Sequence, residues 1–152
     1  MNTILTRILG ASAALLLLLQ LVPYGRQHTN PPVVQEPNWD SPQTRALAKR
    51  ACFDCHSNET AWPWYSNVAP MSWAVQEHVD EGREILNFSE MNRAFEEAGE
   101  AGETVAEGTM PIPNYVWLHA EANLSPAEKQ ALVAGLNASM PAGGEGEGDD
   151  DD

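Results

Sequence analysis

Residues 52–56 read Cys-Phe-Asp-Cys-His, and this stretch decides the fold expected for the 152-residue chain. It contains both cysteines of the chain, and the histidine directly follows the second one. C-x-x-C-H is the signature of covalent haem attachment. Two thiols with this spacing reach the two vinyl groups on one edge of the macrocycle, and the adjacent imidazole is placed to bind the iron. The motif predicts one covalent haem c, held by Cys52 and Cys55, with His56 as an iron ligand.

Three other uses of the cysteine pair compete with haem attachment. A zinc site would need two more ligands, for which the scattered His78 and His119 are the candidates. A thioredoxin-like redox pair would follow a strand in a βαβ unit, whereas this pair comes late in a predicted helix. A disulfide between Cys52 and Cys55 would be strained. We expect haem because the motif uses both cysteines in the right order.

Met110 is the expected sixth ligand of the iron. It precedes Pro111, which prevents a regular helix and leaves an irregular backbone that can present the thioether. Methionine opposite histidine is usual in electron-carrying cytochromes. His78, on the apolar face of a predicted helix, is the chief rival, and an open sixth position is a third alternative. Met110 would otherwise only fill the core.

Aromatic residues cluster shortly after the motif. Trp62, Trp64 and Tyr65 are candidate haem contacts, because the macrocycle offers rings a broad apolar surface; ordinary core packing is the alternative. Arg83 is a candidate partner for the haem propionates, since guanidinium groups bind carboxylates bidentately. In its acidic surroundings, a surface ion pair is the simpler interpretation.

Residues 1–25 have the composition of an export signal. An apolar run over residues 8–19 follows Arg7, and no small-x-small cleavage site follows the run. We therefore expect an uncleaved transmembrane helix, with a cleaved signal peptide as the alternative. Arg7 on the cytoplasmic side would place the protein in the bacterial inner membrane, single-pass, with its domain facing the periplasm.

The remaining chain divides into three parts. Residues 26–40 form a proline-rich extended spacer, residues 41–140 the haem-binding domain, and residues 141–152 a disordered acidic tail. Apolar residues at helical spacing and capping patterns predict an all-α fold without strands. The expected helices begin at Ser41-Pro42 and continue through the motif, span residues 72–86, begin again at Ser89 with a break near Gly99 and Gly102, and run from Ser125 to Ala138.

The chain is strongly acidic, with a net charge of −14. Only 8 Lys and Arg residues stand against 22 acidic ones, which argues against nucleic acid as a partner. Six of the acidic residues lie in the tail. The expected partners are redox proteins with a basic docking face. The sequence leaves the oligomeric state open.

Beyond the motif, three segments carry a family resemblance: CFDCHSNETAWPWYSNVAPMSW (52–73), HVDEGREILNFSEM (78–91) and GTMPIPNYVWLHAEANLS (108–125). They resemble the bacterial haem-binding domain family of small, often membrane-tethered monohaem proteins. The resemblance covers residues 31–136. It implies a cytochrome c-like helical domain with haem on Cys52, Cys55 and His56, and it fits Met110 as distal ligand. It does not imply a reaction.

The function expected from these residues is single-electron transfer by a membrane-anchored c-type cytochrome rather than enzymatic catalysis. An iron with histidine and methionine ligands has no free position for a substrate. The main alternative is a haem enzyme or gas sensor, such as a small peroxidase, with a labile sixth ligand. A subunit whose haem mainly stabilises its fold is a third hypothesis.

Overall fold

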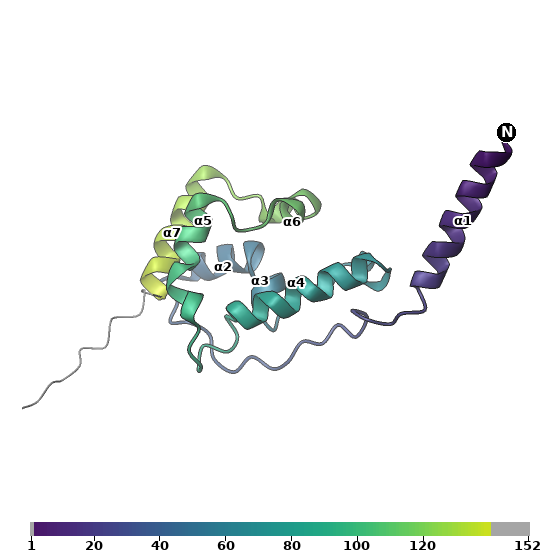
Figure 1. Cartoon of the computed structure of the whole chain (residues 1–152). Helices are drawn as coiled ribbons and strands as arrows, with labels where there is room; N and C mark the ends of the chain where they lie inside the picture. The colour runs from purple at the N-terminus through teal and green to yellow at the C-terminus, as the bar shows by residue number, and fades with distance from the viewer. Residues whose placement is uncertain (1, 141–152) are drawn as a thin grey trace, which may run out of the picture.

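The computed structural model describes residues 2–140, and this part of the chain is all-helical. Its only β pairing is an isolated bridge between Gln35 and Glu90, so the all-α prediction is confirmed for the described residues. Figure 1 shows α2 to α7 gathered together and α1 standing apart. The predicted acidic tail, residues 141–152, lies outside the described residues. The α-helices are α1 (Thr3–Leu19), α2 (Pro42–Ala51), α3 (Phe53–His56), α4 (Met71–Ile85), α5 (Ala101–Glu107), α6 (Pro113–Leu118) and α7 (Pro126–Ser139), with 3₁₀ turns η1 (Trp64–Asn67), η2 (Glu96–Glu100) and η3 (Ala120–Ala122).

The core lies between α2, α5 and α7, and it reaches the haem motif through Phe53. The Phe53 ring is buried and stacks on Phe88 at a centroid distance of 5.6 Å. Burying a ring of this size is worth about 2 kcal/mol or more, so the core fixes α3 firmly. The other buried apolar residues of the cluster are Leu47, Ala48, Ala51, Leu86, Val105, Leu132, Leu136 and Met140.

Two helix starts are confirmed by their caps. Ser41 accepts a hydrogen bond from the Thr44 amide, and Ser125 and Glu128 form a reciprocal capping box. Such caps are worth about 1 kcal/mol each. The predicted continuation of the first helix through the motif is interrupted, because Cys52 leaves helical geometry at φ −127° between α2 and α3.

The helix predicted to begin at Ser89 is wrong. The Ser89 carbonyl accepts hydrogen bonds from the amides of Val34 and Gln35, and its side chain accepts from the Asn58 amide. The side chain expected to cap a helix is therefore already engaged. The predicted break at Gly102 is also wrong, since this glycine lies inside α5, where a Cβ would collide with Asn137 of α7.

The predicted spacer, residues 26–40, is extended but lies against the domain. Arg83 of α4 donates to the Thr29 carbonyl at 3.1 Å and to Asn30 Oδ1 at 3.1 Å. It also donates to the Ser57 carbonyl at 2.8 Å and to Thr60 Oγ1 at 3.0 Å, just after the haem motif. Arg83 thus joins two chain segments, and its guanidinium is committed to them instead of being available to haem propionates.

The transmembrane anchor predicted over residues 1–25 is wrong. Within residues 2–140, the structure contains no helix with both the length and the apolar character needed to cross a membrane. The helix α1 in this segment has 17 residues. It ends at Leu19, and the Gln20 side chain instead bonds the Leu16 and Ala69 carbonyls. The predicted single-pass inner-membrane location facing the periplasm is overturned with it.

Candidate haem site

An apolar cavity lies where α3, α4 and the loop before α6 meet. Its first lobe, about 200 Å³, is lined by Cys52, Cys55, His56 and Met110, among others. A second lobe, about 80 Å³, shares three of these residues and extends to core residues such as Val105. The structure therefore brings together the four residues that the sequence predicts to bind haem and its iron.

His56 is held as a neutral imidazole with one free nitrogen. Its Nδ1 lies 3.1 Å from the Leu86 carbonyl, which can only accept, so Nδ1 donates. Burial lowers the pKa of His56, although the backbone hydrogen bonds partly oppose this effect. The remaining nitrogen, Nε2, keeps its lone pair. A ring fixed by a carbonyl through its other nitrogen is the usual arrangement of a metal-binding histidine.

The two cysteines are free thiols, and their surroundings favour the protonated form. Burial raises the pKa of Cys52 to about 12 and that of Cys55 to about 11. Thiolates that exchange disulfides have lowered pKa values instead, so the raised values disfavour the redox-pair alternative. The part of the chain that the structure describes contains no group of three or more His, Cys, Asp or Glu residues arranged for a metal ion, which disfavours the zinc alternative.

Gly82 lets α4 approach the haem motif closely. A Cβ at this position would lie 2.5 Å from the Cys55 carbonyl oxygen, a backbone atom that cannot rotate away. The close approach places His78, one turn earlier on α4, in the wall of the cavity. The sequence predicted a helix over residues 72–86, but no local pattern signals this contact.

We expect Gly82→Ala to destabilise the haem-loaded protein by about 1–3 kcal/mol, because the added methyl forces α3 and α4 apart. Chemical denaturation monitored by circular dichroism measures this change in the free energy of unfolding. Gly10→Ala in α1 is the matched control, since nothing lies within 4 Å of a Cβ there. Equal stabilities of the two variants would contradict the packing argument.

Met110 lies in the loop between α5 and α6 and lines both lobes of the cavity. The loop begins at Gly108, which adopts φ 82° at the end of α5. The Met110 amide then donates to the Thr104 carbonyl at 3.1 Å. Met110 is 36% exposed, so its side chain lies at the edge of the cavity. His78 lines the first lobe as well, and it remains the rival ligand.

The predicted aromatic contacts are not brought to this cavity. Trp64 is 79% exposed, and Trp62 stacks on His28 at a centroid distance of 4.7 Å. Neither lines either lobe. The Tyr65 hydroxyl bonds His119 Nε2 at 2.7 Å and lies beside a smaller cavity next to Cys55. Trp62 and Tyr65 instead contact histidines of other segments, His28 and His119.

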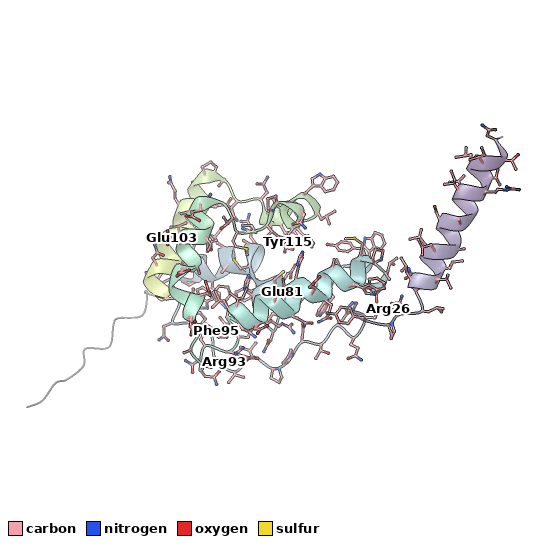
Figure 2. All side chains as sticks on the ribbon, in the orientation of Figure 1. Arg26, Glu81, Arg93, Phe95, Glu103 and Tyr115 are labelled. Atoms are coloured by element: carbon pink, nitrogen blue, oxygen red, sulfur yellow. The ribbon has the colours of Figure 1, made fainter. Side chains whose placement is uncertain are left out.

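Tyr115 is a site residue that the sequence reasoning missed. It lines the first lobe, and its hydroxyl donates to Asp54 Oδ2 at 2.8 Å. Burial and the nearby Asp54 carboxylate raise its pKa, which keeps the hydroxyl protonated and able to donate. In Figure 2, Tyr115 lies on the side of α6 that faces α4. The contact joins residues 61 positions apart, and no local pattern signals it.

The site fits a haem. The walls are apolar, a neutral imidazole nitrogen is free, and two thiols lie beside it. A small helical domain with these features is a haem-binding protein by fold and site. The family model of the haem-binding domain matches residues 14–138, and the chain belongs to this family. No curated protein and no solved structure matches the chain significantly. The family resemblance noted in the sequence is thereby confirmed.

Proposed function

We propose that the protein is a monohaem c-type cytochrome that carries single electrons. Cys52 and Cys55 would hold the haem through two thioether bonds, and His56 and Met110 would bind its iron. The observation that carries the proposal is that all four side chains line one apolar cavity. An iron bound by both a histidine and a methionine would have no free position for a substrate, which supports a carrier over an enzyme.

The bound haem would supply a one-electron couple, and each residue of the site has a separate task. His56 would bind the iron through Nε2, while the Leu86 carbonyl fixes the orientation of its ring. Met110 would contribute a neutral thioether, which favours reduced iron. The apolar walls, including Val105 and Leu136, exclude water and limit reorganisation when charge changes.

Partners with a basic docking face fit the surface around this cavity. Glu81 lines the first lobe and Glu97 the second, so a carboxylate lies in the wall of each. Figure 2 shows Glu81 on α4. Further exposed acidic residues on this helix are Glu77, Asp80 and Glu84. A partner with the opposite charge would be steered towards the haem.

We expect electron exchange with a basic redox protein to slow as the salt concentration rises. Ions screen surface charges beyond a Debye length of about 10 Å at 0.1 M. Stopped-flow measurements between 10 mM and 500 mM salt would give the dependence. An uncharged one-electron reagent is the control and should show almost none. A rate that rises with salt would contradict the docking proposal.

The proposal is tested by maturing the full chain together with a haem-attachment system. Mass spectrometry should show one haem that survives denaturation. The oxidised protein should show a sulfur-to-iron charge-transfer band, and the reduced protein a low-spin spectrum. A colourless product would end the proposal.

A haem enzyme or gas sensor is the second candidate function. It is favoured by His78, which lies in the same cavity wall as Met110 and offers a distal acid–base group. Carbon monoxide distinguishes the two candidates. Fast binding to the reduced wild-type protein would favour an enzyme or sensor, whereas slow binding limited by loss of methionine would favour the carrier.

A further inference from the structure

The loop that carries Met110 is fixed unevenly at its two ends. On the α5 side, the Thr104 carbonyl accepts from the amides of Thr109 and Met110, both at 3.1 Å, and from the Thr109 hydroxyl at 2.9 Å. On the other side, the loop continues into α6, which has six residues, none of them fully buried. Packing alone therefore holds the second end weakly.

Tyr115 supplies the missing anchor. Within residues 2–140, its bond to Asp54 is the one hydrogen bond that a side chain of α6 makes with another element. Asp54 is itself fixed, because its Oδ1 accepts from the Ala61 amide at 2.9 Å. The Tyr115 ring also stacks on His119 at 4.2 Å, and His119 bonds the Tyr65 hydroxyl. The bond thus runs from the middle of the haem motif to α6, five residues after Met110.

We propose that Tyr115 is a positioning residue: its hydrogen bond to Asp54 ties α6 to the haem motif and holds Met110 opposite His56. One partner of this bond lies in the haem motif and the other in α6. The distance between these two segments determines whether the Met110 thioether reaches the iron. The inference rests on the proposed function, because it takes Met110 as the sixth ligand. Without the bond, the loop opens more often and the sixth position is exposed more often.

The test is Tyr115→Phe in the haem-loaded full chain, which removes the hydroxyl and keeps the ring that lines the cavity. Carbon monoxide can bind the reduced iron only when methionine has left, so its binding rate reports loop opening. We expect this rate to rise about tenfold, the change that corresponds to losing one hydrogen bond to a charged group. The sulfur-to-iron band should weaken in parallel.

Tyr24→Phe is the matched control, because Tyr24 is an exposed tyrosine of the N-terminal segment and lines neither lobe of the haem cavity. It should leave the binding rate and the band unchanged. A double-mutant cycle adds a second readout: in an Asp54→Ala background, Tyr115→Phe should have no further effect. If Tyr115→Phe does not accumulate, Asp54→Ala alone should raise the rate by a similar factor.

The outcomes separate this inference from the proposed function. A wild-type protein with haem but no sulfur-to-iron band would refute Met110 as ligand and the inference with it. A wild-type protein with the band, and a Tyr115→Phe variant with wild-type rates, would overturn the inference alone. The inference would also be overturned if Tyr115→Phe raised the carbon monoxide binding rate equally with Asp54 present and with Asp54→Ala, because Tyr115 would then act without Asp54.

Discussion

Replacing both cysteines by alanine, in the Cys52→Ala/Cys55→Ala variant, is expected to abolish haem retention under denaturing conditions. Each thiol would supply one thioether bond, whereas bonds from His56 and Met110 to the iron would break when the chain unfolds. Haem staining after denaturing electrophoresis and the mass of the intact chain measure the loss. The retained fraction should fall from nearly complete to none.

The single variants are the controls for this prediction. Cys52→Ala and Cys55→Ala each leave one thiol, so each should retain haem through one bond, at lower yield. The double variant is still expected to bind haem reversibly, since His56 and the apolar walls are intact. Haem that survived denaturation in the double variant would show that the attachment lies elsewhere.

Met110→Ala is expected to eliminate the sulfur-to-iron band and to lower the reduction potential. The thioether stabilises reduced iron, and axial ligands set potentials over a range of about 0.8 V. A fall on the order of 0.1 V or more is therefore expected. Spectra of the oxidised protein and redox titration measure the two effects, and carbon monoxide should bind the reduced variant quickly.

Two further substitutions make the ligand assignment decisive. Met71→Ala is the matched control, because Met71 is exposed at the start of α4 and lines neither lobe of the cavity. It should leave the band and the potential unchanged. His78→Ala should also keep the band if Met110 is the ligand. A band that persists in Met110→Ala, or disappears in His78→Ala, would show that the wrong residue was assigned.

Local patterns explain which parts of the fold were predictable. Ser41 and Ser125 start helices because each cap is decided by residues within four positions of it. Ser89 has the same local signal, but distant backbone groups use its hydrogen-bonding capacity, and no helix forms there. An apolar run predicted a spanning segment, whereas α1 ends at Leu19.

The residues of the site also differ in how far the sequence predicts them. Cys52, Cys55 and His56 lie within five consecutive residues, so the motif itself brings them to the same wall of the cavity. Met110 was reached through its neighbouring proline and the family resemblance. Tyr115 was not reached, because its contact depends on how α6 folds back over α3.

The path of residues 26–40 changes where the folded unit begins. The amides of Val34 and Gln35 donate hydrogen bonds to the Ser89 carbonyl, and Arg83 donates to Thr29 and Asn30. A fragment cut at residue 41 would remove these partners and leave Arg83 bound only to Ser57 and Thr60. The folded unit therefore includes residues 26–40, and shortening the chain from the N-terminus would loosen the turn after the haem motif before it removed any residue that lines the haem cavity.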